Sequence, residues 1–162
     1  MRRLYLIRHG EAESERVSPA RPLTDKGRND TKKLAAFLKQ SQAQAGIILH
    51  SDKLRAQETA QILQKLWCLK ASLREEEGLN PNDDPQKILG KIERHSENLV
   101  IVGHLPLVER LLSLLMRWDE SRVGVRFKED TTVVLGKDTT SDWHIVLVVS
   151  PDSLPNSFAP LA

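Results

Sequence analysis

The chain has 162 residues, which corresponds to one domain on a scale of about 150 residues per domain, so a second catalytic domain is not expected. Its 24 Lys and Arg residues against 22 Asp and Glu residues leave a formal net charge of +2, too little to hold a nucleic acid by counterion release. Aromatic residues, at 4%, are too few to form base-stacking platforms. We therefore expect a globular domain with its own hydrophobic core and no nucleic-acid partner.

The single cysteine, Cys68, cannot form an intramolecular disulfide, and the sequence contains neither a CxxC motif nor the Cys/His spacing of a zinc site. A reducing cytoplasm is therefore the expected location. The apolar stretch near the amino terminus, residues 4–7, is too short for the core of a signal peptide or for a membrane span. No membrane association is expected.

The first half of the chain alternates predicted strands and helices. Residues 3–8 predict a buried strand, and Thr24 is a candidate N-cap for a first helix. The apolar run 46–49 predicts a second strand, and Ser51 is the expected N-cap of a second helix. Both helices carry apolar residues at helical spacing, namely Leu34, Phe37 and Leu38 in the first and Ala60, Leu63, Leu66 and Trp67 in the second.

The second half continues the alternation. A short strand is expected near residues 71–73, and Asp84 before Pro85 predicts the N-cap of a third helix. Residues 99–102 give the clearest buried strand, and a fourth helix follows it with Val108, Leu111, Leu112 and Leu115 at helical spacing.

Three later strands are predicted over residues 123–127, 131–135 and 144–149. A tail over residues 151–162 is expected to be loosely ordered or to pack along the sheet edge. Alternating strands and helices indicate an α/β fold, with a mostly parallel sheet covered by helices on both faces.

Basic side chains follow three of these strands. Arg8 and His9 end the first strand, Arg55 lies just after the second, and His104 follows residues 99–102. Ligands of parallel sheets bind where the carboxyl ends of the strands meet, so we expect the four side chains to lie together. Two guanidinium groups and two imidazoles, with no acidic residue among the four, suit a tetrahedral dianion such as phosphate. No metal cage is visible in these loops.

Four sequence blocks, taken in order, resemble the histidine phosphatase superfamily, and within it the short SixA-type branch of bacterial protein phosphohistidine phosphatases. The blocks are LIRHGEA at residues 6–12, RPLT at 21–24 with Gly27, Ser51 with LRA at 54–56 and Thr59, and GHLPLV at 103–108. The resemblance covers essentially the whole chain. It implies a three-layer α/β/α, phosphoglycerate mutase-like fold, with one histidine phosphatase domain over residues 1–162.

The resemblance implies that His9 is the nucleophile that becomes phosphorylated, and that Arg8, Arg55 and His104 grip the phosphoryl group. Phosphoryl transfer spreads charge over the equatorial oxygens, so alignment and surrounding donors supply most of the catalysis. A neutral His9 can attack without a metal when its other ring nitrogen bonds an acceptor such as a backbone carbonyl. His104 is expected to act as a protonated donor.

Further residues near these blocks have less defined roles. Arg21 either reaches the rim of the phosphate site or is a salt-bridged residue before a helix cap. The backbone at Leu105, near the start of the fourth helix, is a candidate phosphate ligand. Ser51 is expected to aim Arg55 by capping its helix, and Asp52 stands where the family often has proline, with no role assigned.

Superfamily members that act on phosphate esters generally use a carboxylic acid to protonate the departing alkoxide. No acid aligns clearly in residues 75–84, because Asp84 is explained as an N-cap and residues 75–77 as a solvated loop, which leaves Asp83 as a candidate. The imidazole of a phosphohistidine, with an ordinary pKa of ~6.5, can instead depart after taking a proton from solvent. The short segment before residues 99–102 also leaves no room for a sizeable lid.

The first hypothesis is therefore hydrolysis of phosphohistidine on a phosphotransfer or phosphocarrier protein, through a phospho-His9 intermediate and with no cofactor. The first alternative is a general or small-molecule phosphomonoesterase with Asp83 as its acid. The second alternative is a non-catalytic module that binds phosphate or phosphoproteins, against which the intact His9 argues.

Overall fold

The computed structural model describes residues 1–119, 124–140 and 142–160. Strands and helices alternate through most of this part, as expected, and the carboxyl-terminal part adds two strands without a helix between them. The elements are β1 (Arg2–Arg8), α1 (Asp25–Gln40), β2 (Ile47–His50), α2 (Leu54–Leu66), β3 (Ser72–Glu75), α3 (Pro85–Arg94), β4 (Leu99–Gly103), α4 (Leu107–Met116), β5 (Thr132–Lys137) and β6 (His144–Val149). None of these helices is long and apolar enough to cross a membrane.

The strands form one sheet in the order β3-β2-β4-β1-β5-β6. The first four run parallel to one another, whereas β5 pairs antiparallel with β1 and β6 antiparallel with β5. Arg8 pairs with Gly103, and His50 pairs with Val102. This register brings the residues that follow β1, β2 and β4 to one edge of the sheet, which is what the candidate site requires.

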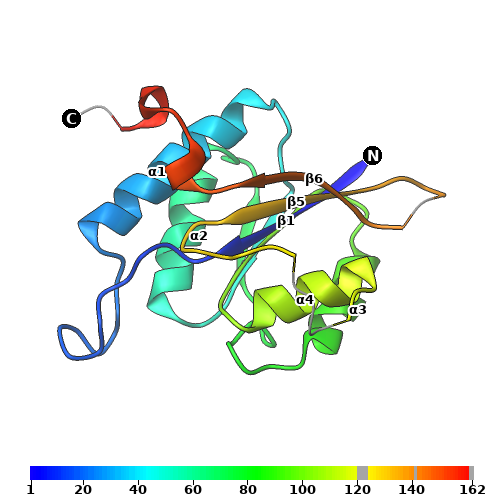
Figure 1. Ribbon diagram of the computed structural model, residues 1–162, viewed down its shortest axis with the longest axis horizontal. Coiled ribbons are helices and arrows are strands. Elements are labelled where there is room, and N and C mark those ends of the chain that lie inside the picture. The colour runs from blue at the N-terminus through cyan, green and yellow to red at the C-terminus, as the bar shows by residue number, and fades with distance from the viewer. Residues whose placement is uncertain (120–123, 141, 161–162) are drawn as a thin grey trace.

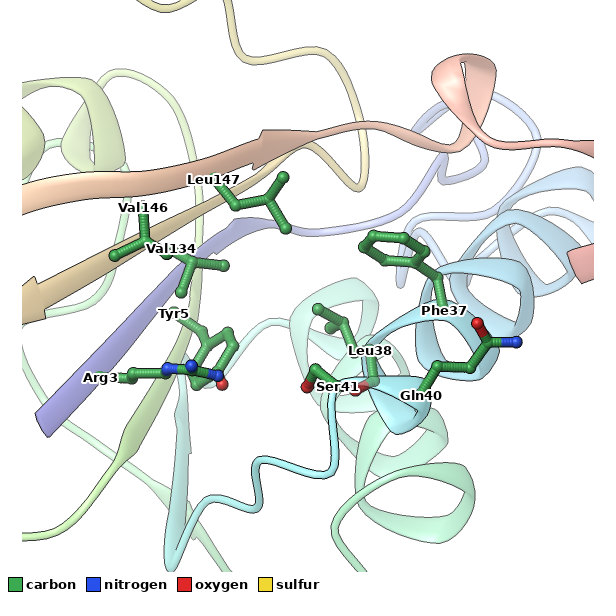
Figure 2. Close-up of a pocket in the computed structure, with 9 residues that line it drawn as sticks. All are labelled: Arg3, Tyr5, Phe37, Leu38, Gln40, Ser41, Val134, Val146 and Leu147. Atoms are coloured by element: carbon green, nitrogen blue, oxygen red, sulfur yellow. Dashed lines mark hydrogen bonds between the residues drawn. The ribbon is translucent and has the colours of Figure 1, made fainter. Parts of the chain in front are cut away.

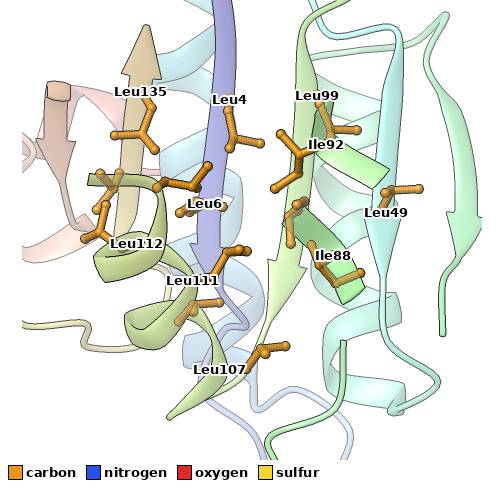
Figure 3. Close-up of a cluster of buried hydrophobic side chains, with 14 of the residues drawn as sticks. Leu4, Leu6, Leu49, Ile88, Ile92, Leu99, Leu107, Leu111, Leu112 and Leu135 are labelled. Carbon is orange, nitrogen blue, oxygen red and sulfur yellow. The ribbon is translucent and has the colours of Figure 1, made fainter. Parts of the chain in front are cut away.

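Helices cover both faces of the sheet, with α1 and α2 on one face and α3 and α4 on the other (Figure 1). Successive residues of β1 point to opposite faces, so Leu4 and Leu6 join the core under α3 and α4 (Figure 3), while Tyr5 and Ile7 join the core under α1 and α2. The expected three-layer α/β/α fold with a mostly parallel sheet is confirmed.

The strand predicted over residues 123–127 is wrong for the part that the structure describes. Residues 124–128 are irregular, and Val123 lies outside the described residues. The carbonyl oxygen of Phe127 accepts a hydrogen bond from Arg8 Nη1 at 2.9 Å, so it serves a side chain of the candidate site and not a neighbouring strand. An apolar pattern alone does not reveal this long-range use of a backbone carbonyl.

The tail packs against α1 (Figure 1). Two short 3-10 helices, Pro151–Ser153 and Asn156–Phe158, follow β6. Lys33 Nζ donates to the carbonyl oxygens of Pro151 and Leu154 at 3.0 and 2.8 Å, and the rings of Phe37 and Phe158 meet edge to face at 5.5 Å. In the described residues, the tail thus contacts α1, which offers it both a cation and an aromatic ring.

An apolar groove of about 440 Å³ lies between the end of α1 and the strands β1, β5 and β6 (Figure 2). Phe37 and Leu38 form one wall, and Val134 and Leu147 form the other. Its β1 residues come from the amino-terminal half of that strand, so the groove is separate from the sheet edge at which β1 ends.

Candidate active site

A cavity of about 300 Å³ opens where β1, β2 and β4 end. It brings together every predicted site residue except Asp83, and it adds two carboxylates that the sequence patterns do not single out. The lining residues are Arg8, His9, Glu11, Ala12, Arg21, Arg55, Pro81, His104, Leu105 and Glu129.

His9 lines this cavity with only 7% of its surface exposed. Its Nδ1 is 2.8 Å from the carbonyl oxygen of Gly10, and its Nε2 accepts a hydrogen bond from Arg55 Nε at 3.3 Å. Because a carbonyl oxygen can only accept, Nδ1 carries the proton and Nε2 holds the free lone pair. Burial, aided by the cationic Arg55 and Arg8 and opposed by the Gly10 hydrogen bond, lowers the pKa of His9 to about 4, so the ring is neutral at pH 7.

The loop that carries His9 is held by α2. The backbone N–H of Gly10 donates to Thr59 Oγ1 at 3.0 Å, and the Thr59 hydroxyl donates to the carbonyl oxygen of Arg55 at 2.8 Å. A Cβ atom at Gly10 would lie 2.9 Å from both Thr31 Oγ1 and Asp130 Oδ2, so the close approach of these side chains requires glycine. One network therefore positions both His9 and Arg55.

Arg8 is oriented by the segment that precedes β5. Its Nη1 donates to the Phe127 carbonyl at 2.9 Å, and its Nη2 donates to Glu129 Oε1 at 2.8 Å. The other carboxylate of the wall, Glu11, accepts a hydrogen bond from Thr24 Oγ1 at 2.8 Å. Glu129 belongs to none of the sequence blocks, and its segment reaches the site because the adjoining β5 pairs with β1. Glu11 lies in the first sequence block, so that block is the signal by which Glu11 could have been predicted.

Arg21 lies on the cavity wall near Arg55. It has a left-handed backbone conformation (φ 50°), and its Nε donates to the carbonyl oxygen of Glu13 at 2.9 Å. Burial and the nearby cation of Arg21 both lower the pKa of Arg55. Of the two interpretations of Arg21, the structure thus favours a place at the rim of the site, held by a backbone carbonyl.

Ser51 has a different place from the one expected. Lys53, not Ser51, is the N-cap of α2, and it makes no side-chain capping bond. Ser51 Oγ instead lies 2.6 Å from Nε2 of His104 and accepts a longer bond, 3.3 Å, from the backbone N–H of Lys53. Ser51 is buried at the end of β2, so its hydroxyl bonds a neighbour in the site.

The expectation of a protonated His104 is not met in this structure. Burial lowers the pKa of His104 to about 3, and the nearby His9 ring and the cations of Arg55 and Lys53 act in the same direction. The ring is therefore neutral at pH 7 and meets that of His9 with 4.9 Å between centroids.

The two remaining candidates lie in different places. Leu105 lines the cavity next to His104, two residues before α4 begins. Asp83 does not line it, because its Oδ2 accepts a hydrogen bond from the backbone N–H of Asn80 at 2.8 Å and closes a local turn. Asp84 caps α3 by accepting from the backbone N–H of Gln86 at 3.0 Å, as predicted.

The site thus combines a neutral imidazole lone pair with three guanidinium groups around one cavity. Such a constellation can surround the oxygens of a tetrahedral oxyanion and present a nucleophile to its centre. Within the described part of the chain, no group of three or more His, Cys, Asp and Glu side chains is placed to hold a metal ion.

Known proteins share features of this sequence and of this fold. The model of the histidine phosphatase superfamily (branch 1) matches residues 4–80, a range that includes His9 and Arg55. None of the curated protein sequences compared matches the chain.

Three solved structures illustrate the likeness in fold. The protein histidine phosphatase SixA in complex with tungstate has a TM-score of 0.82 at 23% identity, over 94% of this chain and 99% of that one. The SixA protein of Agrobacterium tumefaciens has a TM-score of 0.77 at 21% identity, over 93% and 98%. A phosphoserine phosphatase of Entamoeba histolytica in complex with 3-phosphoglyceric acid has a TM-score of 0.72 at 16% identity, over 93% and 98%. The resemblance found in the sequence is thereby confirmed, because the superfamily model matches residues 4–80 and the chain shares its phosphoglycerate mutase-like fold with SixA structures.

Proposed function

We propose that this protein is a protein phosphohistidine phosphatase, which hydrolyses the P–N bond of a phosphohistidine on a phosphotransfer or phosphocarrier protein. The observation that carries the proposal is the state of His9. Its neutral ring directs the Nε2 lone pair at Arg55 inside a cavity lined by Arg8, Arg21 and His104. A cytoplasmic location belongs to the same proposal.

In the first step, His9 Nε2 attacks the phosphorus atom of the substrate. The bond from phosphorus to the substrate imidazole breaks, its electron pair stays on the departing nitrogen, and that nitrogen takes up a proton. The phosphorylated ring of His9 is cationic because Nδ1 keeps its proton, and the Gly10 carbonyl at 2.8 Å stabilises that charge. Arg8 and Arg55 neutralise the charge on the transferring oxygens.

In the second step, water attacks the phosphorus atom of phospho-His9. The bond to Nε2 breaks and its electron pair returns to that nitrogen, so His9 regains its neutral form. Inorganic phosphate leaves carrying both protons of the attacking water. A dianion beside His104 raises the pKa of that ring, so His104 can take up a proton while phosphate is present and donate it as a hydrogen bond. The contact of Ser51 Oγ with His104 Nε2 keeps the ring in place during both steps.

The hydrogen-bond partners of the carboxylate side chains favour a substrate with a P–N bond over an alkyl phosphate ester. Asp83, the candidate acid, closes a local turn. The two carboxylates that line the cavity are also engaged, because Glu11 accepts a hydrogen bond from Thr24 and Glu129 pairs with Arg8. An alkoxide leaving group requires a positioned acid, whereas an imidazole does not. The likeness in fold to SixA proteins agrees with this choice, and that to the phosphoserine phosphatase keeps the ester-cleaving alternative open to test.

The test is a comparison of substrates with wild-type protein and His9→Ala. One substrate is a histidine-phosphotransfer domain that has been phosphorylated with phosphoramidate. The other substrates are a panel of alkyl phosphates, and the phosphate released from each substrate is measured. We expect rapid turnover of the phosphohistidine protein, an acid-labile and alkali-stable phosphoenzyme, and neither in His9→Ala. Full activity of His9→Ala would refute the mechanism, faster turnover of alkyl phosphates would favour the phosphomonoesterase, and anion binding without any turnover would indicate a binding module.

A further inference from the structure

A buried carboxyl group lies behind the loop that carries the proposed nucleophile. Asp130 is 0% exposed and has a left-handed backbone conformation (φ 56°) two residues before β5. Its backbone N–H donates to the carbonyl oxygen of Arg8 at 3.1 Å and, at a longer 3.4 Å, to that of His9. The backbone of Asp130 is thus tied directly to two residues of the site.

The side chain of Asp130 fills the space between Gly10 and α1. Its Oδ2 would lie 2.9 Å from a Cβ atom at Gly10, and its Oδ1 lies 2.8 Å from Thr31 Oγ1. Within the described residues, Oδ2 has no hydrogen-bond partner. The carboxyl group therefore packs against the α-carbon of Gly10, the residue whose carbonyl oxygen orients the ring of His9.

Counting protons indicates which form of the carboxyl group fits this site. Thr31 Oγ1 lies 2.9 Å from the carbonyl oxygen of Gly27 as well as 2.8 Å from Asp130 Oδ1. One hydroxyl proton cannot serve two acceptors, whereas a protonated Asp130 donates to Thr31 and leaves the Thr31 proton for Gly27. An ionised carboxylate would instead hold a buried charge with an unpartnered oxygen, which is unfavourable.

The charges around Asp130 act in the same direction. Burial, the largest cause, together with the carboxylates of Asp30 and Glu129, raises the pKa of Asp130 to about 8, against the lowering effect of the Thr31 hydrogen bond and of Lys26. Lys26 is itself paired with Asp30 at 2.5 Å. From β1, Arg8 faces Asp130 through its backbone carbonyl and directs its guanidinium group to Glu129.

We propose that Asp130 is a positioning residue that acts as a protonated acid, bridging Thr31 of α1 to the Gly10 peptide and so holding the ring of His9 ready for attack. The inference rests on the proposed function of His9. Loss of the proton places a carboxylate oxygen against the Gly10 peptide with no donor, which displaces that peptide and with it the acceptor of His9 Nδ1. The rate of phosphoryl transfer then falls while the affinity for the substrate, set by the arginines, changes little.

The test compares wild-type protein with Asp130→Asn, since an asparagine amide can donate to Thr31 but cannot ionise. Hydrolysis of the phosphorylated histidine-phosphotransfer domain is followed from pH 6 to pH 9.5. We expect wild-type kcat to fall about tenfold per pH unit once Asp130 ionises, with KM changing less than about twofold. Asp130→Asn should keep kcat within about threefold of wild type at pH 7 and lose the alkaline fall. The exposed Asp142→Asn is the matched control and should behave as wild type.

An alkaline fall that persists unchanged in Asp130→Asn would overturn the inference. A second measurement does not depend on turnover or on that variant, because the carbon-13 signal of the Asp130 carboxyl can be titrated in the wild-type protein by NMR. Titration in the ordinary range of an aspartate, near ~4, would also overturn it. If the protein hydrolyses no phosphohistidine, the proposed function fails, whereas the titration of Asp130 and the hydrogen bond of His9 Nδ1 remain measurable. Thr31→Val tests the same bridge from α1 and should lower kcat with little change in KM.

Discussion

The Nε atom of Arg55 lies 3.3 Å from Nε2 of His9, so a cationic donor points at the lone pair of the proposed nucleophile. This contact favours the neutral, Nδ1-protonated form of His9, because a protonated Nε2 would face the Arg55 cation. The same guanidinium group lies where it can bind the oxygens of a phosphoryl group in front of His9. In the proposed mechanism, Arg55 thus both keeps His9 neutral and binds the oxygens of the phosphoryl group that His9 receives.

Replacing Arg55 with glutamine removes the cation and keeps a polar side chain. We expect kcat/KM for a phosphohistidine protein to fall about 100-fold, as for loss of one charged transition-state contact. The pKa of His9 should rise from about 4 but stay below its ordinary value, because burial is the larger cause of its lowering. Steady-state kinetics and an NMR titration of the His9 ring measure the two effects. An unchanged pKa of His9 would contradict the electrostatic part.

The acid limb of the pH profile should report on His9. A lowered pKa means that His9 is still unprotonated, and able to attack, well below the pH at which an ordinary histidine is half protonated. We expect kcat/KM to stay level from pH 7 down to about pH 5, and to fall as pH drops through about 4. The measurement uses short assays with a stability check at each pH. A midpoint near ~6.5 would show that His9 has its ordinary pKa.

Protonation of the buried histidines should also destabilise the fold in acid. For His9 and His104, with folded pKa values of about 4 and about 3, the unfolded chain binds protons first as pH falls below ~6.5. As pH falls from ~6.5 to the folded pKa of each histidine, protonation of the unfolded chain therefore lowers the free energy of unfolding. Each of the two groups lowers it by up to about 1.4 kcal/mol per pH unit. Urea unfolding at pH 7 and pH 5 measures this loss, which should be smaller in His104→Asn.

Removing the Ser51 hydroxyl should affect the site and spare α2. Ser51→Ala deletes the 2.6 Å contact with His104, whereas the helix keeps its N-cap residue, Lys53. A loss of about 1 to 1.5 kcal/mol in holding His104 corresponds to a fall of roughly tenfold in kcat/KM. Ser41→Ala is the matched control, because that hydroxyl donates to the Leu38 carbonyl at the far end of α1. Equal activities of the two variants would exclude a role for Ser51.

Replacing Asp83 with asparagine separates the two kinds of substrate. The side-chain oxygen of asparagine can still accept the hydrogen bond from the backbone N–H of Asn80, which is 2.8 Å long in the wild type. The substitution therefore keeps the turn and removes the acid. We expect turnover of a phosphohistidine protein to stay within about twofold of wild type, because its leaving group needs no positioned acid. Strong turnover of alkyl phosphates by the wild-type protein that collapses in Asp83→Asn would identify Asp83 as the acid and favour the phosphomonoesterase.

The parts of the fold that the sequence predicted correctly depend on neighbours in the chain. Thr24 and Asp84 are predictable as N-caps because a short oxygen-bearing side chain bonds a backbone N–H two or three residues later. The run 99–102 lies within β4 because a strand buried on both faces is apolar throughout. The prediction over 123–127 failed because a strand also requires a partner, and the Phe127 carbonyl bonds Arg8.

The order of strands and basic residues along the chain is enough to indicate which residues meet at the site, since His9, Arg55 and His104 each follow a strand of a parallel sheet. The folded chain alone shows that Ser51 contacts His104, that Asp83 does not line the cavity, and that Glu129 and Asp130 adjoin the nucleophile loop. It also set the neutral state of both histidines. Protonation and long-range pairing depend on burial and on charges brought together from distant segments, and no local pattern of residues encodes either.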